Sequence, residues 1–349
     1  MHQPRSLSAA ISTLVLSALV LPALVPLAGP AGATAARLTA QDVVIGVDNL
    51  YAIACPSASR CIAVGAGNGA DGGDGRTVVI TAATGAPTLW PGSTEYPLES
   101  ISCAGSTNCL AISEFSTQAV ATTNGAAMVT HQFRFSGGLF VLSSVSCTAT
   151  AGCYAGGWEG SSRTGKAVIV HLSATGQLLS QVPLDGTGVA SIACPTSSDC
   201  LFTLVTSAGQ SVEQLDHGQP GPKAELPADL HLGKLSCYGD ETCYALASDV
   251  KDNRQALLAV DPATGKVGAP VPIPGLTAIG LNCVSTGRCL ITGTVNGSAA
   301  VSAVTDGHVG TPVAYPGNSL SAAACASSDL CYAVGNNSAG RAVIDRLAG

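Results

Sequence analysis

Short apolar runs separated by short polar connectors recur along the chain from about residue 40 to its end. Cys61-Ile-Ala-Val-Gly65 and Thr77-Val-Val-Ile-Thr81 are two of these runs, and each has the length of one strand. β-Prone runs around connectors rich in Pro, Ser, Asp and Gly are typical of hairpins. Helical periodicity is weak throughout this part of the chain. The pattern therefore predicts an all-β protein built from successive antiparallel hairpins.

The cysteines divide the chain into repeats. All fourteen fall into pairs with the spacing Cys-x5-Cys, and the first cysteines of successive pairs lie 42 to 48 residues apart. A period in the forties is the mark of a repeat architecture. The pairs are Cys55/Cys61, Cys103/Cys109, Cys147/Cys153, Cys194/Cys200, Cys237/Cys243, Cys283/Cys289 and Cys325/Cys331.

Each repeat has the content of one propeller blade. The first hairpin turns through the five residues between the cysteines, and a second turns through Gly-containing connectors such as Ala83-Thr84-Gly85 or Asp306-Gly307. Facing cysteines at the base of a hairpin lie within the reach of a disulfide. Unpaired thiols would not share one spacing, and zinc is disfavoured because no histidine follows at a fixed offset. We expect one disulfide in each blade.

The two ends of the repeat region complement each other. The last repeat stops after Arg341–Arg346 with three strands, while Gln41–Val47 forms a strand ahead of the first repeat. The N-terminal strand should complete the last blade and remove the open sheet edge. The predicted fold is a seven-bladed β-propeller with four-stranded antiparallel blades, formed as a single domain by residues 36–349.

Residues 1–35 have the pattern of a secretory signal peptide, with a basic start, an apolar stretch from Ala9 to Leu27 and small residues at the end. No later segment is apolar for long enough to span a bilayer. The whole chain has a net charge of −7, which disfavours nucleic acid and anionic membranes as partners. We expect a secreted, extracellular monomer, and export would also permit the disulfides.

The repeats resemble a group of secreted bacterial propeller proteins whose blades read Ser-Val/Ile-Ser-Cys-Pro-Ser-x-x-x-Cys-x-Ala-Val-Gly. The match covers residues 36–349 and is sharpest at Ile53–Gly65 and Ser191–Cys200. These proteins look like distant relatives of the Asp-box propellers, which include sialidases and photosystem assembly factors. The resemblance implies fold and export, and it implies no activity because the shared residues are structural.

Catalytic patterns are scarce. A sialidase would need a cluster of three arginines, and the arginines here are few and dispersed. No two histidines have a metal-ligand spacing, and no nucleotide-binding loop opens a helix. We therefore expect a binding protein without a cofactor or a metal. The alternative is an extracellular hydrolase or lyase with its site at the mouth of the central channel.

One acidic, Gly-rich loop is a candidate calcium site. It carries Asn68, Asp71 and Asp74, whose oxygens are the ligand type that calcium prefers. A single turn of this kind is a weak signal because related sites are built between stacked turns. A solvated loop is the better interpretation, with calcium kept as an alternative.

Loop length points to a binding face. The Cys-x5-Cys turn keeps one length, whereas the connection between the second and third strands is long at Ala66–Arg76, Trp158–Lys166 and Ser248–Arg254. Variable loops on a rigid scaffold commonly carry binding residues. We expect an extracellular protein or a cell-wall glycan to bind there, with Trp158 either as an exposed anchor or folded over its own blade. The candidate binding residues are Trp158, Glu159, Arg163, Asp249, Lys251, Asp252 and Arg254.

Overall fold

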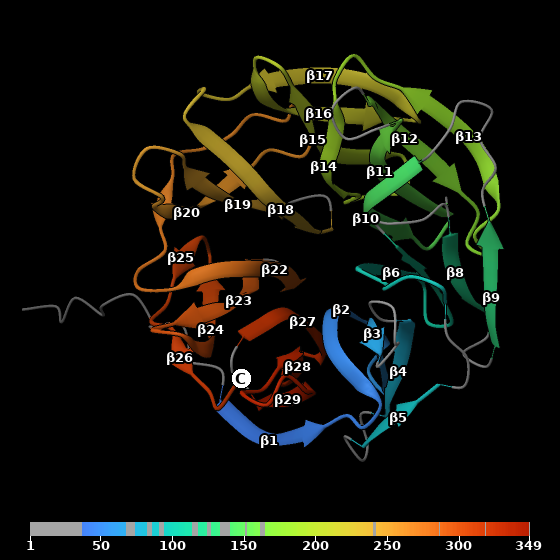
Figure 1. Cartoon of the computed structure of the whole chain (residues 1–349). Helices are drawn as coiled ribbons and strands as arrows, with labels where there is room; N and C mark the ends of the chain where they lie inside the picture. Colours follow the sequence, from blue (N-terminus) through green and yellow to red (C-terminus); the bar gives the residue numbers. More distant parts are fainter. Residues whose placement is uncertain are drawn as a thin grey trace, which may run out of the picture. The chain divides into compact units, whose positions relative to one another are not determined.

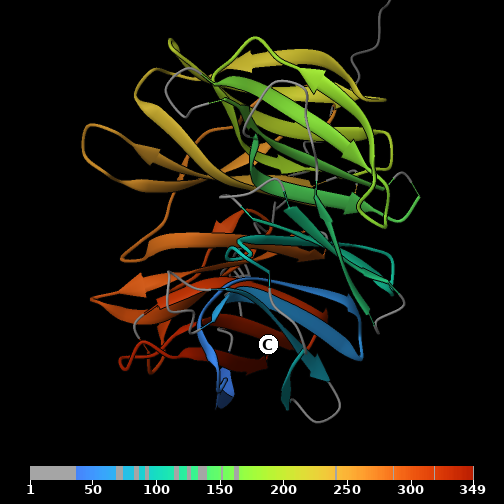
Figure 2. The same cartoon turned by 45° about the vertical axis from the view of Figure 1, so that its right-hand side comes forward.

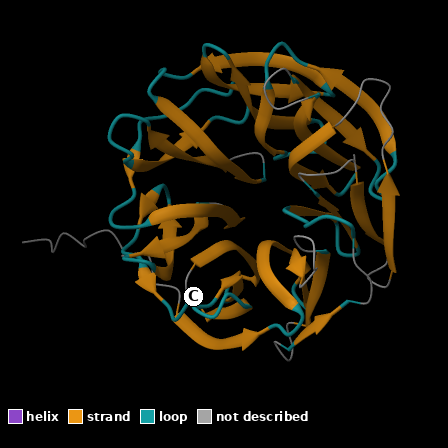
Figure 3. Ribbon diagram, viewed as in Figure 1, coloured by secondary structure: helices purple, strands orange, loops and turns teal. Residues whose placement is uncertain are grey.

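The structure is a computed structural model that describes residues 37–67, 74–81, 86–90, 94–113, 118–123, 127–132, 140–150, 152–160, 165–239, 242–285, 287–317 and 319–348. These residues belong to one compact unit, Ala33–Gly349. They form strands joined by turns, without a helix among them (Figure 3). Within these ranges, no helix offers the length and hydropathy that crossing a bilayer requires.

The described strands form antiparallel meanders, which Figure 1 shows arranged around a centre. Five of the four-stranded sheets follow the chain from the inner strand outward. They are β2 (Val47–Ser57), β3 (Arg60–Gly67), β4 (Gly75–Thr81) and β5 (Pro87–Leu89); β6 (Ser100–Ala104), β7 (Asn108–Ile112), β8 (Gln118–Thr123) and β9 (Ala127–Gln132); β10 (Phe140–Thr148), β11 (Gly152–Glu159), β12 (Lys166–Leu172) and β13 (Leu178–Pro183); β14 (Gly188–Ala193), β15 (Asp199–Thr206), β16 (Gly209–Asp216) and β17 (Gln219–Glu225); β18 (Leu230–Tyr238), β19 (Thr242–Asp249), β20 (Gln255–Val260) and β21 (Val271–Pro272).

Two further sheets complete the ring. One contains β22 (Thr277–Ser285), β23 (Arg288–Val295), β24 (Ser298–Thr305), β25 (His308–Val309) and β26 (Val313–Ala314); the other has the order β27 (Ser319–Ser327), β28 (Leu330–Asn336), β29 (Ala342–Ala348) and β1 (Arg37–Val43). The inner strands β2, β6, β10, β14, β18, β22 and β27 contact one another in that order, and β27 contacts β2. The closed succession of inner strands makes the architecture a β-propeller.

The prediction of seven four-stranded blades is wrong. The described residues form six four-stranded sheets, and the sheet of β22 to β26 has five strands because β25 and β26 both pair with β24. The outer strand is split at Gly310-Thr311-Pro312. Proline cannot donate to the ladder, and Gly310 N–H turns inward to Ala303 O at 2.8 Å. Two short strands therefore stand where one was expected.

The N-terminal strand closes the last blade, although its bounds differ from the predicted Gln41–Val47. β1 spans Arg37–Val43 and pairs antiparallel with β29, while Val47 already begins β2. In both Figure 1 and Figure 2 the blue start of the described chain lies beside its red end. The turn at Gly46, where φ is +81°, redirects the chain into the first blade.

The predicted disulfides are confirmed. Each Cys-x5-Cys pair is bonded across the hairpin of an inner strand and its neighbour, with Cα separations of 3.8 to 4.1 Å, and no cysteine is free. Each bridge lies within one blade, so contacts between blades must come from packing and hydrogen bonds. The bonded pairs are Cys55–Cys61, Cys103–Cys109, Cys147–Cys153, Cys194–Cys200, Cys237–Cys243, Cys283–Cys289 and Cys325–Cys331.

The two cysteines of a pair differ in their surroundings, which the sequence did not predict. The first cysteine is half-buried in every pair except one, in which Cys283 is buried. The second cysteine is buried in every pair, because its strand is covered by a neighbouring sheet on each face. These buried disulfide residues serve the fold and do not belong to an exposed functional site. They are Cys61, Cys109, Cys153, Cys200, Cys243, Cys289 and Cys331.

Apolar side chains pack mainly between neighbouring sheets. Leu50 and Ile80 of the first sheet share a buried cluster with Tyr332 and Ile344 of the last, and the other clusters likewise combine two adjacent sheets. Because each sheet is covered on both faces, strands such as β3 are continuous apolar runs rather than alternating ones.

The glycine four residues after the second cysteine has a steric role in several repeats. A Cβ atom on Gly65, Gly157, Gly293 or Gly335 would overlap a carbonyl oxygen of the adjacent inner strand. Only glycine permits this close approach of two backbones. The approach occurs beside a bulge in the inner strand, which faces the centre of the ring.

Candidate functional site

Bulges recur at one position of the inner strands. The register shifts between Leu142 and Ser144 in β10, and at the equivalent positions of β2, β14, β18, β22 and β27. The extra residue lies four positions before the first cysteine of each pair. Bulges redirect side chains and are frequent beside binding sites. The residues at these positions are Tyr51, Ser143, Ala190, Gly233, Ile279 and Ser321.

Serine hydroxyls join the inner strands of successive blades. Ser102 Oγ accepts a hydrogen bond from Cys147 N–H, and Ser146 Oγ accepts one from Cys194 N–H, each at 2.9 Å. Ser236 Oγ accepts from Cys283 N–H at the same distance. The serine that precedes a cysteine thus satisfies the backbone donor of the equivalent cysteine in the next blade.

A second level of serines repeats this arrangement two residues earlier. Ser100, Ser144 and Ser191 accept hydrogen bonds from backbone N–H groups of the next inner strand at 3.3, 3.2 and 3.0 Å. The Ser-x-Ser-Cys motif is therefore a joint between blades. Sequence analysis recorded the motif without finding this role, although the repetition of serine at fixed offsets from each cysteine was a readable signal.

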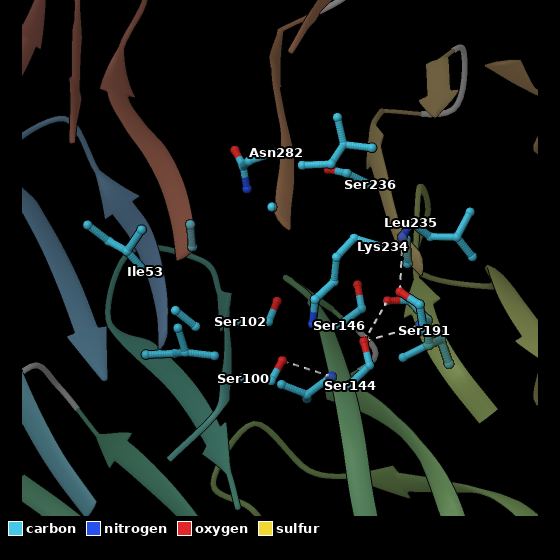
Figure 4. A pocket seen from close by; sticks show the side chains of 18 of the residues that line it. Ile53, Ser100, Ser102, Ser144, Ser146, Ser191, Lys234, Leu235, Ser236 and Asn282 are labelled. Atoms are coloured by element: carbon cyan, nitrogen blue, oxygen red, sulfur yellow. Dashed lines mark hydrogen bonds between the residues drawn. The ribbon is translucent and has the colours of Figure 1, made fainter. Parts of the chain in front are cut away.

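The inner strands enclose a polar cavity of about 280 Å³ (Figure 4). It is lined by residues of all the inner strands, and its described titratable side chains, apart from the bonded cysteines, are Tyr51, Glu99 and Lys234. Burial, assisted by the charge of Glu99, raises the pKa of Tyr51. Figure 4 shows Lys234 extending from β18 into the cavity. The cavity thus combines hydroxyl groups with one cation and one carboxylate.

A second, less polar hollow of about 240 Å³ lies at the rim of the loop-bearing face. It is formed by β14, β18, β19, β20 and β22 and includes Leu246, Ala278 and Ile279. Gln255 ties two blades together there, since its Nε2 donates to Ala278 O at 3.1 Å and its Oε1 accepts from Ala278 N–H at 2.5 Å. Ile279 is 43% exposed and Val250 of the adjacent loop is 53% exposed.

The predicted binding residues of the fifth repeat lie at the end of β19 and on the loop between β19 and β20. Their charged groups interact with other residues of the same repeat. Lys251 Nζ pairs with Asp229 Oδ2 at 2.7 Å, and Arg254 Nε pairs with Asp252 Oδ2 at 2.9 Å. Asp249 Oδ1 accepts from Lys251 N–H at 2.8 Å. The hydrogen bond from Lys251 lowers the pKa of Asp229. Both cationic side chains remain exposed to solvent at 74% and 85%.

Trp158 lies at the end of β11 and packs on the neighbouring blade. The side chain is half-buried, and a Cβ atom on Gly188, the first residue of β14, would lie 3.6 Å from its Cε3. Its Nε1 is buried and has no hydrogen-bond partner among the residues that the structure describes. Glu159 beside it is also half-buried, and Arg163 lies outside the described residues. The tryptophan therefore covers a joint between two blades. It is neither an exposed anchor nor folded over its own blade.

The candidate calcium loop falls mostly outside the described residues, since Asn68 and Asp71 are not among them. Asp74 is described, and its Oδ2 lies 3.4 Å from Arg76 Nη2. The neighbouring Gly67 N–H donates to Asp74 O at 2.7 Å. Asp74 thus interacts with the two strands that the loop connects, through Gly67 of β3 and Arg76 of β4.

Three potential metal ligands meet on the opposite face, at the turns of the fourth repeat. One ligand atom each from Asp199, Asp216 and His217 lies within 4.8 Å of the others. Asp199 already accepts from Thr196 and Ser198 hydroxyls at 2.7 and 2.8 Å, and the pKa of His217 is raised by its contact with Asp216. Sequence reasoning missed this group because its members come from two separate turns. Its exposed, mutually bonded side chains do not by themselves define a metal site.

Comparison with solved structures shows the same fold at low identity. The chain resembles the WD40 β-propeller domain of Doa1, with a TM-score of 0.62, 14% identity, and coverage of 90% of this chain and 97% of the other. It also resembles the β-propeller domain of Myceliophteria thermophila Cps50 (Swd1), with a TM-score of 0.66, 11% identity, and coverage of 90% and 99%.

At this identity the likeness establishes the fold alone. No family model matches the chain, and no curated protein does. The predicted resemblance to secreted bacterial propellers and to Asp-box propellers therefore stays a prediction beyond the propeller fold itself.

Proposed function

We propose that this protein is an exported, non-enzymatic binding module that recognises an extracellular protein through its loop-bearing face. The observation that supports this most directly is the group of side chains around β18 to β22. Ile279, 43% exposed, lines the 240 Å³ hollow together with Leu246 and Ala278. Ser248 and Gln255 line it as well, and the loop between them carries exposed Val250 with Asp249 and Lys251. An apolar centre with charges of both signs at its edge is the usual composition of a protein interface.

A protein partner is favoured over a cell-wall glycan on the chemistry of this face. Sugars are commonly held by exposed aromatic ring faces, and Trp158 instead packs on Gly188 of the next blade. The described loop residues near the hollow are aliphatic and charged. A glycan remains the alternative outcome of the test below.

Export from the cell is part of the proposal. Residues 1–35 have the signal-peptide pattern, and their removal would leave the domain from residue 36 onward. The bonded cysteines support this destination because such bonds persist in oxidising surroundings outside the cytosol. The acidic charge agrees with a protein partner rather than with nucleic acid.

The enzyme alternative receives little support from the central cavity. An acid–base pair needs two titratable groups with suitable environments in contact with a substrate. The described lining has one carboxylate, Glu99, and no histidine. We therefore retain binding as the function that the geometry supports best.

The test is capture of extracellular material by the mature protein, residues 36–349, followed by variants of the face. Ile279→Asp with Val250→Asp should abolish capture, because the first places a charge in the hollow and the second removes an exposed apolar side chain from the loop beside it. Leu179→Asp is the matched control, since Leu179 is 56% exposed on the outer strand β13. Trp158→Ala with Arg163→Ala tests the third repeat in the same way.

Three outcomes would decide the matter. Loss of capture in the Ile279/Val250 variant alone, for a protease-sensitive partner, supports the proposal. A partner that survives proteolysis and is recovered on a glycan array assigns the face to a glycan. Equal capture by all variants at unchanged melting temperature would place binding elsewhere.

A further inference from the structure

The serines of the central cavity have unused donor capacity. A hydroxyl has one donor and two acceptor sites. Ser102, Ser146 and Ser236 each use an acceptor site for a backbone N–H group of the next blade. Among the described residues no acceptor receives the O–H groups of these three side chains. Three hydroxyl donors on β6, β10 and β18 are therefore available to a molecule in the cavity.

Lys234 adds a full positive charge to this arrangement. It occupies the position three residues before the cysteine, where β6, β10 and β14 carry Ser100, Ser144 and Ser191. The three serines bond to the next inner strand, whereas Lys234 extends into the cavity (Figure 4). Gly280 follows at this level on β22, and Asn282 adds an amide on the same strand.

The opposite wall of the cavity is apolar. β27 and β2 contribute Ala322 and Ala52 at the level of Lys234. Glu99 lies at the side of β6 and β2, where its charge influences Tyr51. The cavity therefore has a donor-rich wall with a cation, a small apolar wall and a single carboxylate away from β18.

We propose that the central cavity binds a small organic molecule with one carboxylate group. The ammonium of Lys234 and the hydroxyl groups of Ser102, Ser146 and Ser236 would hold the carboxylate, while Ala52 and Ala322 contact its carbon skeleton. Charge-assisted hydrogen bonds of this kind are about twice as strong as neutral ones. Glu99 disfavours a second negative charge at the other end of the ligand.

The volume limits the size of the ligand. Pockets for drug-sized molecules occupy about 300–1,000 Å³, and this cavity of about 280 Å³ lies just below that range. A monocarboxylate of a few carbon atoms fits, and a polymer chain does not. Lys234 borders both this cavity and the 240 Å³ hollow, whereas Ser102, Ser146 and Ser236 line the cavity alone. Carboxylate binding and partner capture are measured separately, so that either proposal can fail without the other.

The experiment is calorimetric titration of the mature protein with butyrate, lactate, glycine, succinate and sulfate, in a buffer free of carboxylates. Butyrate or lactate should bind, and succinate and sulfate should bind at least tenfold more weakly. Lys234→Met should lower the affinity for butyrate or lactate by tenfold or more. Lys266→Met is the matched control, because Lys266 is an exposed lysine of the same blade that does not line the cavity, and it should leave the affinity unchanged.

Two further variants keep the result interpretable. Lys234→Gln retains a polar donor and guards against a folding defect in the Met variant. Glu99→Gln should narrow the preference for butyrate over succinate, since it removes the repulsion of the second carboxylate. Circular dichroism melting of each variant checks that the propeller remains intact.

The carboxylates are titrated up to about 10 millimolar, on the order of the weakest relevant affinity. If none of them gives a heat of binding, water alone fills the cavity and the proposal is overturned. Equal affinity of the Lys234→Met and wild-type proteins would overturn it as well. Preferential binding of sulfate would assign the site to inorganic anions instead.

Discussion

The joints between blades are made in two different ways around the ring. From β6 to β22, serine hydroxyls on one inner strand accept hydrogen bonds from backbone N–H groups of the next. At the closing joint, β27 carries Ala322 and Ala324 at the positions of these serines. β2 likewise carries Ala52 and Ala54 at the positions that face β6. The closing joint has a buried cluster that includes Tyr332, and the added strand β1 completes its blade.

The difference shows what closing a ring demands of the chain. An ordinary joint connects blades that are already adjacent in sequence, and its serine hydrogen bonds add to a buried apolar cluster of its own. The closing joint connects residues about 300 positions apart, as in the contact between Gln41 Nε2 and Asp345 Oδ1 at 2.7 Å. Bringing distant segments together costs loop-closure entropy that only later contacts recover. The larger apolar cluster and the additional strand lie where that cost is greatest.

Removing β1 should have the largest effect on the molecule. Deletion of residues 37–43 exposes the edge of β29 and removes the partner of Asp345, and we expect a loss of at least about 5 kcal/mol or outright aggregation. Chemical denaturation and size-exclusion chromatography measure the two outcomes. A truncated protein that stays monomeric with unchanged unfolding would show that the closing joint does not depend on β1.

The buried carboxyl at the closing joint should make stability depend on pH. Asp345 is fully buried, and burial raises the pKa of its carboxyl from 3.8 to about 6 despite the hydrogen bond from Gln41. Its Oδ2 has no partner among the described residues. A raised folded-state pKa means that the native state holds the proton more tightly, so this contribution is complete below pH 3.8 and is lost as pH rises through 6.

The Asp345→Asn variant isolates this contribution from the other carboxylates. The difference in unfolding free energy between wild type and variant should shift by about 2.4 kcal/mol between pH 4 and pH 7.5, with the wild type relatively less stable at the higher pH. Burial, followed by the charge of Asp345, raises the pKa of the nearby Tyr315 to about 12. Burial also raises the pKa of Tyr332. A pH-independent difference would mean that the carboxyl titrates normally.

Much of this architecture could be predicted from cysteine spacing and strand patterns. Fourteen cysteines at one spacing fixed the hairpins and their disulfides, and the surplus strand at one end matched the deficit at the other. The split outer strand could not be predicted, because Thr311-Pro312 reads as an ordinary turn until the pairing of both halves with β24 is known. The start of β1 was misplaced because exposed residues such as Arg37 and Thr39 carry no apolar signal.

The candidate site was harder to predict than the fold. The sequence pattern places Trp158 in a loop, whereas its environment depends on Gly188 in the next blade. Lys234 and Glu99 were not recognised at all, since only the ring of inner strands brings residues 135 positions apart into one cavity. Sequence periodicity identifies equivalent positions in each repeat. It does not show which of those positions face the common centre.

The disulfides offer a comparison within single blades. Cys194→Ser with Cys200→Ser should cost about 2 kcal/mol, because each bridge closes only a short loop. Cys325→Ser with Cys331→Ser removes an equivalent bridge from the closing blade. Equal costs, measured by denaturant titration under non-reducing conditions, would show that the bridges stabilise blades independently of their joints. A much larger cost in the closing blade would contradict that independence.

The smallest expected effect tests one ordinary joint directly. Ser146→Ala removes the acceptor of Cys194 N–H, and an unsatisfied donor of this kind costs about 1–2 kcal/mol when water cannot replace the lost partner. Ser197→Ala in the adjacent exposed turn is the matched control and should change stability by no more than about 0.5 kcal/mol. Hydrogen exchange at the Cys194 amide provides a local readout, and this exchange should accelerate in the Ser146 variant alone.

Ser102→Ala combined with Ser236→Ala should give additive losses of stability, because these hydroxyls serve separate joints. If the Ser146 variant keeps both its stability and its amide protection, the hydroxyls are not what holds these blades together, and the two kinds of joint would both rest on apolar packing.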